Sequence, residues 1–231
     1  MNTLILHIET ATDVCSVALS ESGKLLKEII NTDERSHGSQ LTLMMQELCK
    51  QAGVKFDQLD ALSISKGPGS YTGLRIGAAT AKGFCFALNK PLIAINTFDS
   101  FVQTFSEQQK NLLESLSGSF LFCPMIDARR MEVYYSLHRS DKSMLTETKA
   151  EVITQNSFAQ ELNDHKIIFF GSGAMKCKAL LQQLSNAIFV DNFFPFAAGQ
   201  RSLAYDLFLQ KKFENIVYFE PFYLKEFLGR H

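Results

Sequence analysis

The sequence predicts an α/β protein built from two α/β halves. Three short strand patterns, at Leu4–Glu9, Val14–Ser20 and Lys24–Ile30, follow one another through short turns and predict an antiparallel meander. Helix and strand patterns then alternate as far as Ile95, and a second alternating run starts after Ser117. With 231 residues the chain has the length of one large domain or two small ones.

The first half continues with a helix at about Ser36–Gln51. Its apolar side chains recur on one side, and Gly53 stands where a C-cap would end it. A strand at Asp60–Ser65 then leads into a second helix, and a strand at Leu92–Ile95 follows Pro91. The apolar side chains of the first helix are Leu41, Met44, Met45 and Leu48.

The second alternating run predicts the second half of the protein. It is preceded by residues 106–117, which are polar and fit an exposed connector or a short helix. The expected strands are Phe120–Ile126, Met131–Leu137, Met144–Ala150, Ile167–Phe170 and Ile188–Val190, and the expected helices lie around Ala174–Leu184 and Ala197–Gln210.

A glycine-rich loop joins the strand at Asp60–Ser65 to the second helix. Such a loop lets backbone N–H groups converge on a phosphate at the helix N-terminus, or it serves as a tight structural turn, and both interpretations are open. A P-loop is excluded, because Gly73-Leu74-Arg75 stands where that motif needs Gly-Lys-Ser/Thr. The candidate phosphate contacts are Gly67, Gly69, Ser70 and Thr72.

Two carboxylates end strands in the two halves. Glu9 ends the first strand, with Thr12 just beyond it, and Asp127 follows the strand that starts at Phe120. If these strand ends face each other, the two carboxylates and Thr12 would form a vestigial nucleotide or phosphate site. In the alternative interpretation, Glu9 and Thr12 satisfy N–H groups of their own loop.

The second helix carries a stripe of small residues. Gly73, Gly77 and Ala81 recur every four residues and leave one face of the helix bare, so that another backbone can approach closely. Met44 and Met45 on the preceding helix are adaptable side chains that suit a partner surface, although core packing explains such residues equally.

Charge gives no sign of a strong electrostatic partner. The chain has 23 basic and 24 acidic residues and a formal net charge of −1, so it has no overall positive field to attract a polyanion. Its short basic pairs, Arg129-Arg130 and Lys211-Lys212, read as ordinary surface, the second at the end of a helix where cations complement the helix dipole.

Cysteine usage and the lack of targeting segments predict a cytoplasmic protein. The five cysteines, at positions 15, 49, 85, 123 and 177, form no Cys-x-x-Cys pair, and an odd number of free thiols suits a reducing compartment. We see no signal-peptide pattern and no apolar stretch of membrane-spanning length, so no membrane partner is expected.

We expect no metal, no cofactor and no catalytic residues. The histidines stand singly, which is typical of hydrogen-bonded structural residues. No Ser-His-Asp or Cys-His set can be assembled, because no base is placed beside a serine or cysteine. The histidines are His7, His37, His138, His165 and His231.

Several segments, in this order, resemble one protein family. The run Gly67–Gly77, Gly-Pro-Gly-Ser-Tyr-Thr-Gly-Leu-Arg-Ile-Gly, is the most specific of them. It looks like the signature of the TsaB (YeaZ) family, a partner in the synthesis of threonylcarbamoyladenosine in tRNA. The other matching segments are residues 5–12, 15–19, 35–37 with Leu41, 127–134 and 221–224.

The resemblance implies the actin-like, Hsp70-like ATPase fold (ribonuclease H-like), with two related α/β halves of which the second is reduced. The corresponding division is an N-terminal half at residues 1–100, a C-terminal half at 101–195, and a last helix and tail at 196–231 that return to the N-terminal half.

The resemblance further implies a noncatalytic subunit. Its N-terminal helices would dock a TsaD-like transferase in a heterodimer, a TsaE-like ATPase would bind at the junction, and tRNA would be reached through the complex only. Alone, the chain would form a homodimer. The TsaD type holds a metal with two histidines four residues apart, whereas Leu41 stands four residues after His37. The implied interface residues are Ser36, His37, Leu41, Met44, Met45, Leu48, Gly73, Arg75, Gly77 and Ala81.

Two alternatives remain beside this reading. The first is a small ATP-dependent phosphotransferase of the same fold, acting independently through Glu9, the loop Gly67–Gly73 and Asp127. The second is a self-sufficient homodimer in which the same helices pair about a two-fold axis.

Overall fold

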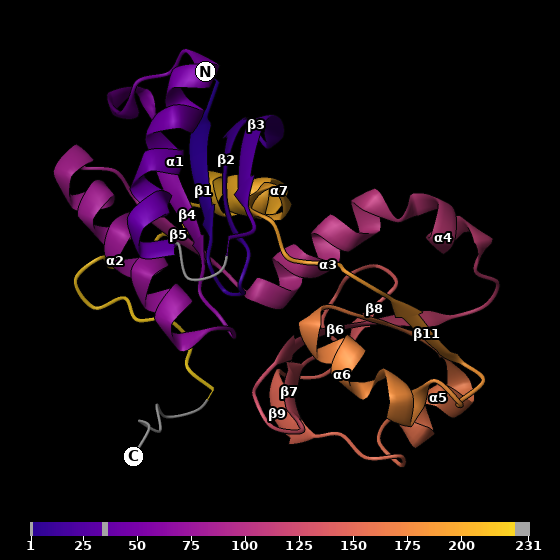
Figure 1. Cartoon of the computed structure of the whole chain (residues 1–231). Helices are drawn as coiled ribbons and strands as arrows, with labels where there is room; N and C mark the ends of the chain where they lie inside the picture. Colours follow the sequence, from indigo (N-terminus) through magenta and orange to yellow (C-terminus); the bar gives the residue numbers. More distant parts are fainter. Residues whose placement is uncertain (1, 34–36, 225–231) are drawn as a thin grey trace, which may run out of the picture. The chain divides into compact units, whose positions relative to one another are not determined.

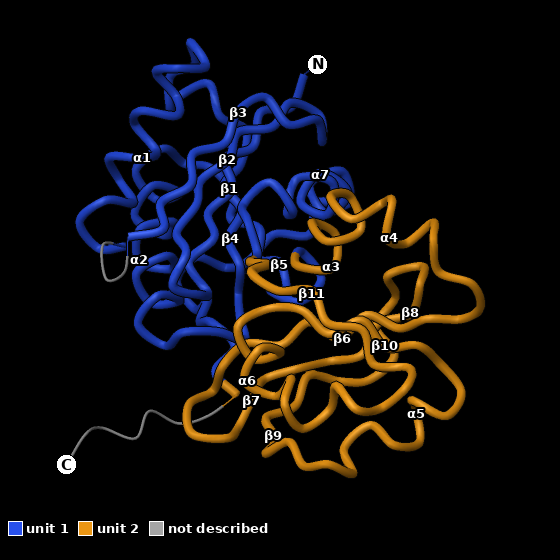
Figure 2. Tube along the Cα trace, turned by 45° about the vertical axis from the view of Figure 1, so that its right-hand side comes forward, with its two compact units in different colours: residues 1–100, 195–223 blue, residues 101–194, 224–231 orange. Residues whose placement is uncertain are grey.

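The protein forms two compact units, which Figure 2 shows in separate colours. The computed structural model describes residues 2–33 and 37–224. Unit 1 combines residues 1–100 with residues 195–223, and unit 2 takes the intervening residues 101–194 together with Leu224. The chain therefore leaves unit 1, completes unit 2 and returns to unit 1.

Unit 1 is built on a five-stranded sheet in the order β3-β2-β1-β4-β5. The first three strands pair antiparallel in sequence order, so the predicted meander is confirmed. β4 and β5 then extend the sheet parallel to β1. The strands are β1 Leu4–Glu9, β2 Cys15–Glu21, β3 Lys24–Asn31, β4 Ala61–Ser65 and β5 Leu92–Ile95.

Helices cover both faces of this sheet (Figure 1). Alternation along β1 explains this, because successive side chains of a strand point to opposite faces. Leu6 joins the core cluster beneath α1 and α2, whereas Ile5 joins the cluster beneath α7. The elements concerned are α1 His37–Ala52, η1 Phe56–Gln58 and α2 Tyr71–Leu88, and on the return of the chain η2 Ala197–Gln200 and α7 Arg201–Leu209.

The ends of the two long helices follow from local residues. Gly53, with φ of +68°, follows α1 in the left-handed conformation that favours glycine, as the sequence predicts. The hydroxyl of Ser70 accepts a hydrogen bond of 3.3 Å from the backbone N–H of Gly73 and caps α2. Asn89 ends α2 in a left-handed conformation.

Unit 2 has a second sheet in the order β11-β10-β6-β7-β9, with β8 paired to β6. Aromatic rings from α3 and from β10 form part of its core, since Phe105 stacks on Phe170 at 4.1 Å between ring centroids. The elements are α3 Thr97–Gln108, which begins in unit 1, α4 Lys110–Ser115, β6 Phe120–Asp127, β7 Glu132–Tyr135, β8 His138–Arg139, β9 Lys149–Val152, α5 Ala159–Asp164, β10 Lys166–Phe170, α6 Ser172–Leu181 and β11 Ala187–Val190.

Two strand predictions in unit 2 were wrong in their boundaries. The strand expected at Met131–Leu137 is shorter, and the strand expected at Met144–Ala150 begins only at Lys149. A polar turn lies between them, in which the Asp141 carboxylate accepts hydrogen bonds from the backbone N–H and the hydroxyl of Ser143. Such side-chain bonds favour a turn over a strand. In the described part of the chain, no helix is long and apolar enough to cross a membrane.

Candidate functional site

The glycine-rich loop is filled by the protein's own backbone. A Cβ at Gly67 would lie 2.5 Å from the carbonyl oxygen of Phe222, and a Cβ at Gly69 would lie 2.9 Å from the Cα of Ala11. The N–H of Ser70 donates to the carbonyl of Ala11 at 2.7 Å. These contacts favour the structural turn over the phosphate nest, because the space that the glycines open is already occupied.

Glu9 is fully buried and satisfied within unit 1. Its carboxylate accepts from the Ser65 hydroxyl at 2.6 Å and from the N–H of Ala11 at 2.8 Å. The amide of Gln200 approaches it at 3.5 Å. Burial raises the pKa of the Glu9 carboxyl, and these hydrogen bonds oppose the shift. The geometry favours the interpretation in which Glu9 holds its own loop.

Thr12 and Asp127 are also used locally. The carbonyl of Thr12 accepts from His37 Nε2 at 2.9 Å. In unit 2 the exposed Asp127 carboxylate accepts from Lys176 Nζ at 2.6 Å and from the N–H of Arg129 at 2.7 Å. The Asp127 carboxylate is therefore bound within unit 2, whereas the Thr12 hydroxyl is buried in unit 1 with no hydrogen-bond partner among the described residues.

The apolar face predicted on α1 packs into the core of unit 1. These side chains join the cluster formed with β1, β2 and β4, and His37 is buried as well. A partner cannot reach them directly, so the open alternative of core packing accounts for them, and contact with a partner must involve other side chains. The buried residues are Leu41, Met44, Met45 and Leu48. Ser36, predicted beside them, lies outside the described residues.

The small-residue stripe on α2 also faces inward. Gly73, Gly77 and Ala81 are buried. A Cβ at Gly73 would meet the carbonyl oxygen of Thr10, and one at Gly77 would meet the Thr10 hydroxyl. The predicted close approach is present, but the approaching residue is Thr10, which follows β1 in the same unit.

Apart from Arg75, sequence reasoning missed the opposite side of α2, which we call the α2 outer face. It is exposed and has one charged side chain, Arg75. A Cβ at Gly83 would meet open space, and Phe86 is 80% exposed. On α1, Leu43 is 55% exposed. The exposed residues of α2 recur at intervals of three and four positions, and this spacing is the signal in the sequence that indicates an outer face. The α2 outer face consists of Thr72, Arg75, Ala79, Gly83, Phe86 and Ala87.

Beside this face, α2 holds the returning segment of the chain. Lys82 Nζ donates to the carbonyls of Val217 and Phe219 at 3.3 and 3.1 Å. Arg75 donates to the Tyr71 hydroxyl at 2.7 Å. Tyr71 in turn packs against Tyr223, with 4.9 Å between the ring centroids. A groove of about 590 Å³ runs between α2 and this segment.

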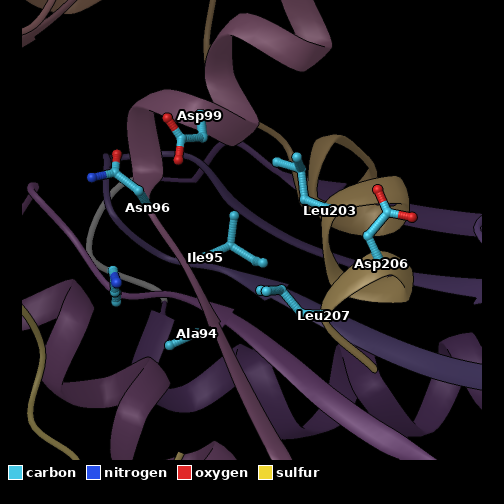
Figure 3. Close-up of a pocket in the computed structure, with 8 residues that line it drawn as sticks. Ala94, Ile95, Asn96, Asp99, Leu203, Asp206 and Leu207 are labelled. Atoms are coloured by element: carbon cyan, nitrogen blue, oxygen red, sulfur yellow. The ribbon is translucent and has the colours of Figure 1, made fainter. Parts of the chain in front are cut away.

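A separate cavity of about 290 Å³ lies in unit 1 at the carboxyl ends of β4 and β5 (Figure 3). In this view Leu203 lies between the carboxylate of Asp99, on α3, and that of Asp206, on α7. Ile95 and Leu207 lie below them. Burial raises the pKa of Asp99, although Lys66 opposes the shift. Two carboxylates against one ammonium do not favour the phosphates of a nucleotide.

The described residues offer no cluster for a metal ion. Among residues 2–33 and 37–224, no three His, Cys, Asp or Glu side chains gather as metal ligands would. His7 instead lies buried between the hydroxyls of Ser63 and Ser20, at 2.6 and 2.7 Å.

Comparison with known proteins assigns the family. Residues 24–226 match the family model described as "TsaD: tRNA N6-adenosine threonylcarbamoyltransferase". A protein of Haemophilus influenzae named "tRNA threonylcarbamoyladenosine biosynthesis protein TsaB" is 36% identical over 138 residues, which cover 58% of this chain. The chain belongs to the TsaB (YeaZ) branch of this family. It spans just over half, 53%, of that TsaB relative's length.

Solved structures show the fold of this TsaB-family chain. "YeaZ from Pseudomonas aeruginosa" superposes with a TM-score of 0.81 at 24% identity, covering 96% of this chain and 100% of that one. The activator of the 2-hydroxyisocaproyl-CoA dehydratase from Clostridium difficile, with bound ADPNP, superposes with a TM-score of 0.52 at 7% identity, covering 93% and 99%. The predicted actin-like ATPase fold is thereby confirmed.

Proposed function

We propose that this chain acts in the modification of tRNA to threonylcarbamoyladenosine, as a noncatalytic subunit that docks a TsaD-like transferase. Membership of the TsaB family supports the pathway. The internal hydrogen bonds of Glu9 and the filled glycine loop support a binding role over catalysis. Further partners in the proposal are a TsaE-like ATPase at the junction, tRNA through the complex only, and a second copy when the chain is alone, all in the cytoplasm.

The observation that carries the docking role is the α2 outer face. An exposed helix face normally carries charges, whereas this one has only Arg75. Phe86 supplies an exposed aromatic side chain, the type that anchors protein interfaces, and Gly83 and Ala79 let a partner helix approach closely. Of the residues predicted for the interface, Arg75 lies on this face, and the buried residues of α1 and α2 support it from beneath.

The pathway is tested by mass spectrometry of tRNA in a reconstituted mixture of partner proteins, with and without this chain. We expect threonylcarbamoyladenosine to form only when the chain is present. An equal amount of threonylcarbamoyladenosine without the chain would exclude the accessory role. It would favour the alternative hypothesis of an independent phosphotransferase.

The docking surface is tested by placing a charge on the α2 outer face. Ala79→Glu puts a carboxylate at its centre and should weaken the heterodimer by a factor of ten or more, since it would be desolvated there without a partner. Ala179→Glu makes the same change at an exposed position of α6 in unit 2 and serves as the matched control. Equal affinity of both variants would exclude the α2 outer face.

A further inference from the structure

The hairpin between β6 and β7 in unit 2 presents two adjacent arginines at its tip. Arg129 and Arg130 are both exposed. The loop is closed by two backbone hydrogen bonds, from the N–H of Ala128 to the carbonyl of Glu132 at 3.1 Å and from the N–H of Glu132 to the carbonyl of Arg129 at 3.2 Å. The two guanidinium groups thus project from a short, closed turn.

The backbone at this tip is strained. Arg129 and Arg130 have φ of +70° and +50°. L-residues other than glycine, asparagine and aspartate rarely adopt this left-handed conformation, and hairpin turns that require it are normally built from Asn-Gly or Asp-Gly. Two successive arginines are an unfavourable choice for the turn itself. Residues held in such conformations concentrate at functional sites.

Contacts within the protein do not explain the choice of arginine. In the part of the chain that the structure describes, neither guanidinium has a hydrogen bond or an ion pair. Asp127, at the base of the hairpin, is paired with Lys176, whose ammonium also donates to the carbonyl of Glu132 at 2.8 Å. Lys176 therefore neutralises the neighbouring carboxylate and fixes the base of the hairpin, which leaves the charges at the tip available.

We propose that Arg129 and Arg130 bind the phosphodiester backbone of tRNA when the chain is part of its complex. This inference rests on the proposed function, which supplies the polyanion. A planar guanidinium donates paired hydrogen bonds that match a phosphate group. Because its net charge is only −1, the chain has no strong overall attraction for tRNA. The two arginines would therefore add to the tRNA binding that a partner protein supplies. This proposal departs from the ordinary surface that the sequence analysis expects at Arg129-Arg130.

The double variant Arg129→Asn with Arg130→Gly tests this proposal without disturbing the turn. Both new residues suit the left-handed conformation, so we expect the melting temperature to rise. In the reconstituted complex, tRNA affinity should fall on the order of tenfold. The slope of the logarithm of affinity against the logarithm of salt concentration should become shallower by about 1.5, because two phosphate contacts are lost. Lys211→Ala with Lys212→Ala removes the other basic pair and should leave both quantities unchanged.

Three outcomes would overturn the proposal. The first is a tRNA affinity and salt slope equal to those of the parent complex, and the second is an equal loss in the Lys211/Lys212 control. The third is weakened subunit assembly in size-exclusion chromatography with unchanged tRNA affinity. That result would indicate that the arginines bind an acidic surface of a partner protein. If the parent chain itself neither assembles nor supports tRNA modification, the proposed function fails, and this inference fails with it.

Discussion

Ser63 on β4 donates a hydrogen bond of 2.7 Å to the side-chain oxygen of Gln200, although 137 residues separate the two. Because its proton is used in this way, the Ser63 hydroxyl accepts from His7 Nδ1, and His7 Nε2 accepts from Ser20. The amide nitrogen of Gln200 donates to the carbonyl of Ile8 at 2.8 Å. This chain of bonds fastens the returning segment to the centre of the sheet.

Removing the Gln200 side chain should destabilise unit 1. Gln200→Ala leaves the carbonyl of Ile8 and the hydroxyl of Ser63 buried without this partner. Each loss should lower the free energy of unfolding by up to about 3 kcal/mol. We expect a clearly lower urea midpoint. Gln210→Ala, which truncates an exposed glutamine just after α7, is the matched control and should change the midpoint little. Equal midpoints for the two variants would contradict the structural role of Gln200.

His7 should make the protein less stable in acid. Burial, and secondarily the positive charge of Arg201, lowers its pKa from 6.5 to about 3. Between these pH values the unfolded chain binds a proton that the folded chain does not, so the free energy of unfolding falls as pH decreases through this window. The decrease is at most about 1.4 kcal/mol per pH unit, and above pH 6.5 His7 has no such effect.

The measurement is the free energy of urea unfolding against pH, for the parent chain and for His7→Gln. Glu9 acts in the opposite direction because its pKa is raised, but it is present in both proteins and cancels to first order in the difference. We expect the variant to have the shallower profile below pH 6.5. Parallel profiles over that window would show that His7 does not titrate as an isolated buried base.

The glycines of α2 show how far the sequence predicts the structure. The four-residue spacing of Gly73 and Gly77 correctly predicts a helix with a close backbone approach. It does not reveal that the approaching group is Thr10, because periodicity describes one helix and not its neighbour. For the same reason the apolar side of α1 was predicted correctly, whereas the surface that is left exposed, such as Phe86, emerges only once the two helices are packed.

Other parts of the structure had no local signal at all. Gln200 is a single amide in a run of small residues, and its role depends on partners more than a hundred positions earlier. The strained tip at Arg129 likewise depends on how β6 and β7 pair, since nothing in an Arg-Arg pair predicts a left-handed backbone. The strand order of unit 1 could be predicted from the sequence, whereas β8, α5 and the candidate contacts could not.

Two glycines of the same helix should respond oppositely to alanine. Gly77→Ala drives a methyl group against the Thr10 hydroxyl and should cost about 1–3 kcal/mol. Gly83→Ala meets open space and should stabilise the isolated chain by about 0.5–1 kcal/mol, because alanine loses less backbone entropy in a helix. Thermal unfolding of both variants gives the comparison, and a stabilising Gly77→Ala would contradict the packing of α2 on β1.

The cysteines should be inert in the folded protein. All five are buried free thiols. Burial raises the pKa of Cys15 and Cys85 to about 12 and that of Cys49 to about 11, and it raises those of Cys123 and Cys177 as well. At about pH 8 very little thiolate is present. A colorimetric disulfide reagent should react slowly with the native chain and rapidly with all five thiols in urea. Fast reaction of one native thiol would reveal an opening of the core around it.

The division of unit 1 between residues 1–100 and 195–223 has a consequence for synthesis on the ribosome. Its sheet emerges early, but η2 and α7 cannot cover the second face until unit 2 has been translated, which takes about 5–20 s at 5–20 residues per second. During this interval Ser63 and the carbonyl of Ile8 lack the amide of Gln200, and Ile5 lacks its cover from α7. The unit that starts first is therefore completed last, and the nascent chain presents a half-covered sheet to chaperones while unit 2 is being made.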